Sequence, residues 1–321
     1  MKKMIFGMLT AALLTTACTS QKEAEGPAEW ETEKITVADS SEYAHVSVEA
    51  ELPLAKDSAM TAMRNTLISL IAKDIRDTYN DNEDEIQQLH MPYKTFEGDT
   101  TDAKAVFAYN LSQLNKFYTA MTKAERVEYD KFRQEEAAAD TTGQTDPDSV
   151  AVPDPSFRTY EQTCEFDTTH TTSKAAVFEL YAYLNNSEAA HPYSSLGAGH
   201  VTLRRSDGKW INQFLVDGAE DKMQSLLLDG MVRFFSDACR DESINRKTVY
   251  SQLLLCDKDG NETKHIPLPQ WPLLFDKDDG LIFMYKQYEV APYAAGMPEF
   301  TIPLQDVMPY LTEDAKSLLA E

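Results

Sequence analysis

The residues that most often carry chemistry are spread along this chain instead of being grouped. The six histidines form no HExxH pattern, and no two of them are three or four residues apart, so the usual zinc spacings are absent. A metal site between His191 and His200 is one alternative, but ordinary loop histidines are the favoured interpretation. No GxSxG, P-loop or GxGxxG motif is present, and acidic pairs are too common here to mark a catalytic pair. We therefore expect no enzyme, no cofactor and no metal.

One cysteine has a setting that predicts modification. Lys2 and Lys3 precede an apolar stretch that is too short to span a bilayer, and the run LTTAC then ends at Cys18. LTTAC resembles a lipobox, although Thr15 stands where leucine is usual. We expect a signal peptide at residues 1–17 and a lipid on Cys18 that anchors the protein in the bacterial cell envelope, facing the periplasm or the exterior. Plain secretion is the alternative.

The other three cysteines predict no metal or redox motif, because none has a CxxC spacing. Cys239 closes an amphipathic helical pattern and Cys256 closes an apolar run, so both are interpreted as small core residues. One disulfide among Cys164, Cys239 and Cys256 is compatible with the sequence.

The charge balance limits the class of partner. The chain has 30 basic and 53 acidic residues and a net charge of −23, which becomes −25 once the signal peptide with its two lysines is removed. Such a surface repels nucleic acid and attracts cationic partners, and their encounter is faster at low salt. Solubility alone is the commoner reason for such acidity.

The periodicity of apolar residues predicts both strands and helices in the first half. Residues 44–52 alternate, which predicts a half-buried strand, and residues 58–77 have one apolar helical face. Residues 102–121 predict another helix, after which Thr122-Lys-Ala-Glu125 resembles a capping box that starts a further helix. Residues from about 134 to 156 are rich in small, polar and proline residues, which predicts a disordered loop.

Strand patterns dominate the second half. Predicted strands cover residues 157–170, 175–185, 200–205, 209–214, 249–256, 281–290 and 300–304. Ser206-Asp207-Gly208 indicates a hairpin turn, and Asp217 to Glu220 resembles a capping box before a helix that ends near Arg240. A last helix is expected at residues 305–319. Because strands and helices do not alternate as βαβ units, we predict an α+β fold, with helices packed on a mainly antiparallel sheet and a helical insertion.

The segment LIFMYKQYEVAPYAAGMPEFTIPL, residues 281–304, breaks its own strand pattern. Pro292 removes a backbone donor and Gly296 can adopt positive φ, so a strand, a kinked aromatic loop and a returning strand are expected. Core and surface positions are equal alternatives for the tyrosines of the loop. The candidate binding residues are Tyr288, Glu289, Pro292, Tyr293 and Gly296, together with His191.

The run YKQYEVAPYAAGMPEFTIPLQDVMPYL resembles the signature of the RsiV-type C-terminal domain family, an extracytoplasmic domain of largely unknown function. Ala190-His191-Pro192 resembles the Gly-Gly-Ala-His turn of that family, although Glu188 and Ala189 replace the glycines. The resemblance covers residues 157–319 well and 35–77 loosely, with 78–156 as an insertion. It implies a binding domain, because members include lipoproteins, forms fused to cell-wall deacetylases, and an anti-sigma factor whose outer domain binds lysozyme. This chain has no cytoplasmic segment, so we do not expect the anti-sigma role.

The sequence therefore predicts an envelope lipoprotein that is a non-catalytic binding module, with a cationic protein such as lysozyme as its partner. A glycan- or peptidoglycan-binding module, in which tyrosines and Trp271 stack on sugars, is the second hypothesis, and an unrecognised envelope hydrolase is the third. The membrane is reached through the N-terminal lipid, and no nucleic acid is expected. The expected regions are a signal peptide at 1–17, a flexible tether at 18–34, a strand and helix region with the insertion at 35–156, and the RsiV-like α+β domain at 157–321.

Overall fold

The computed structural model describes residues 31–142, 157–185, 193–194, 199–256, 259–276 and 279–319, with the backbone alone for 137–142, 193–194 and 293. Cys18, the predicted signal peptide, most of the predicted tether and His191 lie outside these described residues.

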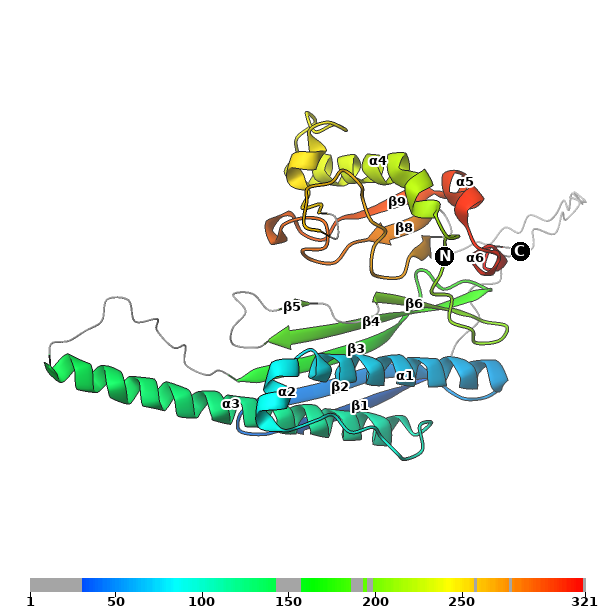
Figure 1. Cartoon of the computed structure of the whole chain (residues 1–321). Coiled ribbons are helices and arrows are strands. Elements are labelled where there is room, and N and C mark those ends of the chain that lie inside the picture. Colours follow the sequence, from blue (N-terminus) through cyan, green and yellow to red (C-terminus); the bar gives the residue numbers. More distant parts are fainter. Residues whose placement is uncertain are drawn as a thin grey trace, which may run out of the picture.

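The described residues form an α+β molecule of two units, which confirms the predicted fold class (Figure 1). A six-stranded sheet carries three helices on one face, and the second unit, built on a three-stranded sheet, lies on its other side. Each unit has its own apolar core. The strands of the large sheet are β1 (Thr32–Ser40), β2 (Ala44–Pro53), β3 (Arg158–Asp167), β4 (Ala175–Asn185), β5 (Tyr193–Ser194) and β6 (Gly199–Arg204).

The large sheet is antiparallel except at its centre, where β2 and β3 run parallel. A parallel pair needs a crossover, and the three helices that cover the sheet supply it: α1 (Ser58–Asn80), α2 (Glu83–Leu89) and α3 (Ala103–Thr142). Alternate β2 residues are buried, as the sequence pattern predicts. The sheet thus combines strands from both sides of residue 157, and β1 begins inside the predicted tether, at Thr32.

The third helix is longer than predicted. No capping box forms at Thr122, because α3 continues through it as one helix. Thr122 and Glu125 instead lie one turn apart and both bind the buried Arg158 at the start of β3, with Arg158 Nη2 2.5 Å from Glu125 Oε1. The helix also passes residue 134, where the disordered loop was expected, and the rest of that loop lies outside the described residues.

The second unit packs one long helix, α4 (Ala219–Cys239), on the small sheet of β7 (Leu274–Asp276), β8 (Gly280–Met284) and β9 (Glu299–Pro303). A Cβ atom at Gly230 would lie 2.2 Å from the Phe300 ring, so this glycine allows α4 to approach β9 closely. Short helices complete the unit: η1 (Val249–Gln252), η2 (Tyr293–Ala295), α5 (Leu304–Val307), η3 (Met308–Tyr310) and α6 (Glu313–Ser317).

Several predicted elements of this half are wrong. Residues 249–256 form a 3₁₀ turn and an isolated bridge instead of a strand, and residues 305–319 form three short helices around Pro309 instead of one. The turn at Gly208 is present, with φ +74°, but residues 209–214 leave the sheet after a single bridge. Gly218 caps α4 without a side-chain hydrogen bond, so the predicted capping box at Asp217 is absent.

The cysteine predictions hold only in part. Cys164 is buried, but Cys239 and Cys256 are exposed, so these two are not core residues. All three are free thiols in the structure. Cys239 is the last residue of α4 and lies outside its buried apolar face, which is why the helical pattern misplaced it.

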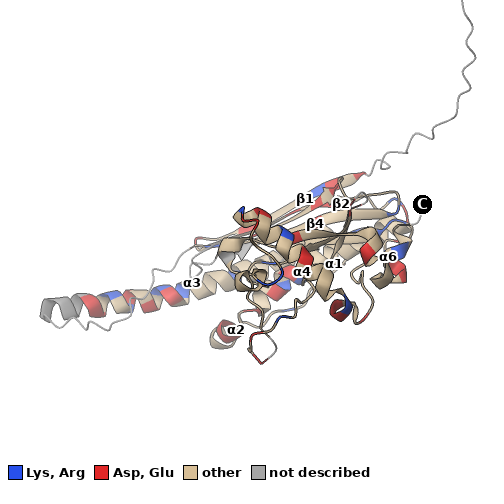
Figure 2. Ribbon diagram, turned by 90° about the horizontal axis from the view of Figure 1, so that it is seen from above, with Lys and Arg blue, Asp and Glu red and all other residues tan. Residues whose placement is uncertain are grey.

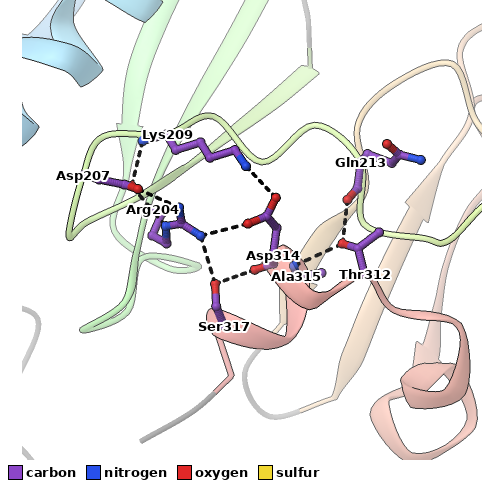
Figure 3. Close-up of polar contacts among 8 residues, drawn as sticks. All are labelled: Arg204, Asp207, Lys209, Gln213, Thr312, Asp314, Ala315 and Ser317. Carbon is purple, nitrogen blue, oxygen red and sulfur yellow. Dashed lines mark hydrogen bonds and ion pairs between the residues drawn. The ribbon is translucent and has the colours of Figure 1, made fainter.

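A polar junction joins the two units (Figure 3). Asp314 of α6 accepts hydrogen bonds from Arg204 at 3.0 Å and from Lys209 at 2.6 Å; Arg204 is the last residue of β6, and Lys209 follows the turn after it. Backbone bonds lie beside this cluster, from Val216 N to the Tyr310 oxygen and from Thr312 N to the Phe214 oxygen. The C-terminal segment therefore fixes the connection that leads from the large sheet into α4.

Charged residues of both signs alternate along the outer part of α3 (Figure 2), where Lys131 pairs with Glu135 and Arg133 pairs with Glu136. Residues 123–136 of this stretch have no buried side chain, and they are stabilised by pairs one turn apart. Among the described residues, no helix combines the length and apolar character needed to cross a bilayer.

Candidate binding site between the two units

A cavity of about 480 Å³ lies beside the junction of the two units. One wall is the connection from the large sheet into α4, residues 210–220, and the other is the proline-rich segment 268–273. Neither segment forms a regular element apart from the start of α4, so both present backbone and side chains of mixed character. Trp210, Phe214, Trp271 and prolines supply apolar surface, and amide and carboxyl side chains supply polar groups.

Trp271 is wedged between the two units. It is 6% exposed but is part of neither apolar core, and a Cβ atom at Gly199 of β6 would lie 3.0 Å from its ring. Lys286 Nζ lies 5.9 Å from the ring centroid, which is a cation–π distance. The indole nitrogens of Trp271 and Trp210 are buried without a hydrogen-bond partner in the described part of the chain. The burial of Trp271 is a correction to the expectation that its ring stacks on a sugar.

Glu289 stabilises the backbone of the segment 268–273, which forms one wall of the cavity. Its carboxylate accepts hydrogen bonds from the backbone N–H of Gln270 at 2.7 Å and of Lys286 at 2.8 Å. Burial raises the pKa of Glu289, while these two hydrogen bonds act in the opposite direction. Close by, the Tyr285 hydroxyl donates to the Pro267 oxygen at 2.8 Å. The kinked loop is thereby tied to the segment that contains Trp271.

The loop after β8 has the predicted break, since the strand ends at Met284. Tyr288 is 52% exposed and has a left-handed backbone with φ +63°, which is rare for a bulky residue and marks a tightly determined turn. Pro292 is exposed, and Gly296 has φ +78° with open space at its Cβ position. Tyr293 starts a short 3₁₀ helix, and its side chain is outside the description.

The mouth of the cavity is acidic. Asp217 accepts a hydrogen bond from Gln213 at 3.0 Å, and Glu220 accepts one from the Leu268 backbone at 3.3 Å. Asp221, one residue further along α4, is mostly exposed and lies 3.1 Å from the His265 ring. Acidic side chains in the first turn of a helix are favoured by its dipole, so α4 supports this arrangement.

Of the residues named from the sequence, Trp271 lines this cavity and Glu289 binds the backbone of its wall, whereas Tyr288, Pro292 and Gly296 are not among the lining residues. The sequence analysis did not name Trp210, Gln270 or the acidic residues of the lining. The signal was present as two irregular runs that combine tryptophan with amide side chains, WINQF and PLPQW. Irregular segments have no repeating pattern of apolar residues, so the sequence alone does not show that these two runs lie side by side in the fold. No group of three or more His, Cys, Asp or Glu side chains in the described residues is arranged to hold a metal ion.

A known family matches here. Its model, described as a protein of unknown function (DUF3298), matches residues 269–305. The DUF3298 match begins inside the cavity wall, contains Trp271 and Glu289, and ends after β9. It supports the general resemblance seen in the sequence without reaching its RsiV-type form.

Two solved structures of DUF3298 proteins are similar to this chain. The protein from Bacteroides fragilis has 12% sequence identity and a TM-score of 0.51, with 91% of this chain and 98% of that chain covered. The protein from Pseudomonas aeruginosa has 11% identity and a TM-score of 0.49, with 92% and 99% covered. The first of these supports the fold, at an identity too low to transfer a function. No curated protein matches the sequence.

Proposed function

We propose that this protein is an extracytoplasmic, non-catalytic binding module, held at the cell envelope by lipid on Cys18, whose partner is a cationic protein. Lysozyme is the candidate that the RsiV-type resemblance implies. The acidic balance of the chain, 53 acidic against 30 basic residues, supports a basic partner because complementary charge raises the rate of encounter.

The observation that carries the proposal is the pair of carboxylates at a cavity whose walls also have apolar surface. Asp217 and Glu220 line the cavity, and Asp221, which follows Glu220 in the first turn of α4, is exposed. A lysine or arginine side chain has the matching form, since its aliphatic stem can lie against Pro269 and Leu268 while its charged end meets the carboxylates. Charge-assisted hydrogen bonds of this kind are stronger than neutral ones.

The test is calorimetry with purified c-type lysozyme at two salt concentrations, on the full chain carrying Cys18→Ser so that no lipid is attached. We expect sub-micromolar binding that weakens at the higher salt. Asp217→Asn with Asp221→Asn should weaken it further, whereas Asp237→Asn with Asp306→Asn, the same charge change on exposed residues elsewhere, should not. Absence of binding at either salt would remove lysozyme as the partner.

A second candidate is a glycan ligand, and the composition of the same cavity favours it. Asn212, Gln213 and Gln270 line the cavity beside the less buried Trp210, and amide groups with aromatic surface suit the hydroxyls and apolar faces of sugars. Binding to purified sacculi that persists at high salt would favour this ligand, because attraction between exposed charges is screened there.

A further inference from the structure

A second cavity has a different chemical character. It has a volume of about 660 Å³ and lies between the start of β4, the turn after β6 and the end of α6. Its lining consists only of basic and hydroxyl side chains: Ser173, Lys174, Arg204, Arg205, Ser206 and Ser317. The lining contains three cations and no carboxylate, so its charge is opposite in sign to the net charge of −23 of the whole chain.

Arg204 is fixed in place before any ligand arrives. Its guanidinium donates to Asp207 through Nε at 3.0 Å and to Asp314 through Nη1 at 3.0 Å (Figure 3). Neither carboxylate lines the cavity. Ser317 is also fixed, because its hydroxyl donates to the Asp314 backbone oxygen at 2.6 Å. One side of the cavity is therefore rigid, which lowers the entropy lost on binding.

Arg205 is held on the opposite side by a hydrogen bond from Nη1 to the Thr172 backbone oxygen at 2.9 Å. Burial lowers the pKa of Arg205, which means that its positive charge is partly desolvated. An anion in the cavity would offset that desolvation, since a partly buried cation gains more from a counter-charge than a cation in water does.

Lys174, Ser173 and Ser206 complete the lining and are exposed. Their side chains make no hydrogen bond or ion pair with another residue that the structure describes. They are thus available as donors to a ligand, in contrast to Arg204 and Ser317. Lysine, arginine and serine donors around one space are the groups that bind the oxygens of phosphate.

We propose that this cavity, between the start of β4 and the turn after β6, is a binding site for a phosphate-class oxyanion. Lys174 and Arg205 supply the charge, Ser173 and Ser206 supply neutral donors, and Arg204 forms the fixed floor.

The position of the cavity suggests a source for the anion. The turn after β6 packs on the start of α1, because a Cβ atom at Gly208 would lie 2.5 Å from the Ala59 oxygen. The first described residues are at the same end, where Leu54 N donates to the Glu31 oxygen at 3.0 Å. Phospholipid headgroups would be close to this end if the chain is anchored through Cys18, a point that rests on the proposed function. Free phosphates are the other source, and they require no anchor.

The primary experiment is titration of the full chain carrying Cys18→Ser with inorganic phosphate, followed by calorimetry or amide chemical shifts, with chloride at equal ionic strength as the reference. We expect saturable phosphate binding that Lys174→Gln with Arg205→Gln weakens by about tenfold or more, the effect of losing charged hydrogen bonds. Lys116→Gln with Lys247→Gln is the matched control, because it removes the same charge from exposed sites outside the cavity.

Replacing Arg205 can itself destabilise the fold, so Lys174→Gln alone is the second variant. The Lys174 side chain has no described partner to lose. This variant should weaken binding while the thermal unfolding midpoint stays unchanged. Phosphate binding no stronger than chloride binding, or equal loss in the control variant, would overturn the proposal.

Vesicles then separate the two sources. The unlipidated chain is mixed with phosphatidylcholine vesicles with and without phosphatidylglycerol, and free phosphate is added as competitor. Binding to the anionic vesicles that phosphate reverses identifies headgroups as the source. Phosphate binding without vesicle binding identifies a free phosphate and leaves the site intact. Neither result depends on lysozyme, so failure of the proposed function and failure of this site can be told apart.

Discussion

The phenol of Tyr160 has one proton and two oxygen neighbours. It lies 2.8 Å from Asp74 Oδ2 and 2.9 Å from Gln162 Oε1, and all three side chains are buried between the large sheet and α1. A protonated Asp74 closes this network, because it can donate to Tyr160 while Tyr160 donates to Gln162 and Gln162 donates back to Asp74 at 3.2 Å. Burial raises the pKa of Asp74 to about 6. Asp74 therefore keeps its proton to a higher pH than an exposed aspartate does.

Asp74 predicts an unusual dependence of the stability of the fold on pH. A folded-state pKa raised above the unfolded value means that the Asp74 contribution to stability is fully present below about pH 4 and is lost as the pH rises through about 6. The difference amounts to about 3 kcal/mol at most. Asp74→Asn should therefore gain stability relative to the unmodified chain at pH 7.5 and lose that advantage near pH 4, as measured by urea unfolding. Asp77→Asn, one turn away and half exposed, is the control. If the free energy of unfolding of Asp74→Asn and of the unmodified chain changed with pH by the same amount, the prediction would be contradicted.

Glu289 gives the second prediction at this scale. Its carboxylate accepts two backbone N–H groups, so Glu289→Ala leaves both without their acceptor and should destabilise the fold by about 1–3 kcal/mol. Hydrogen exchange at the Gln270 and Lys286 amides should accelerate. Glu313→Ala, on a side chain that is 89% exposed, should change neither quantity. Weaker ligand binding by Glu289→Ala with unchanged exchange would instead place Glu289 at the interface.

Among the elements, α4 depends on a residue that is unfavourable in a helix. Replacing an exposed helical glycine with alanine usually adds about 1 kcal/mol of stability. At Gly230 we expect the opposite sign, because the new methyl group would overlap Phe300, whose ring stacks on Phe283 at 5.7 Å and cannot move aside freely. Gly230→Ala should therefore lower the free energy of unfolding by about 1–3 kcal/mol. Chemical unfolding measures this, with Lys222→Ala on the exposed face of α4 as the control. A rise in stability would show that the helix can shift away from β9.

The elements also show what the sequence can and cannot predict. Residues 44–52 and 58–77 were predicted closely, since each has a sustained period that matches one buried face. Residues 175–185 were also predicted closely, from their content of aromatic and β-forming residues. The split of α3 at Thr122 was wrong, because a capping pattern is indistinguishable in sequence from two helix residues that bind a distant arginine. The strand at 249–256 was wrong because its apolar residues serve a 3₁₀ turn and a bridge.

The candidate cavity was only half predictable. The family match begins in one wall of the cavity and continues into the aromatic, kinked run after β8, which can be recognised without a fold but is outside the lining. The opposite wall, with Trp210 and Asp217, is irregular and distant in sequence, and it reaches the cavity only because Asp314 and Thr312 hold the connection against the second unit. Long-range polar contacts of this type have no local pattern.

At the scale of the whole molecule, Asp314 joins the two units through its contacts with Arg204 and Lys209. Asp314→Asn weakens its ion pairs with Arg204 and Lys209, so the junction should open more often while each core stays folded. Hydrogen exchange should accelerate at the Val216 and Thr312 amides and stay unchanged within β3 and β4. Asp229→Asn, which breaks a pair with Arg246 inside the second unit, is the control. Uniform acceleration across both units would show that they unfold together.

The parallel pairing of β2 with β3 has a consequence for biosynthesis. The chain is made from its N-terminus, and β2 ends at Pro53 while its partner begins only at Arg158. Until that partner has been translated, one edge of β2 has open backbone groups beside an apolar face, which is a template for aggregation. Such a distant pairing also forms slowly, because a long loop must close first. A nascent chain that has not yet reached β3 is expected to need a chaperone. A protein truncated before residue 158 is expected to be recovered as aggregate.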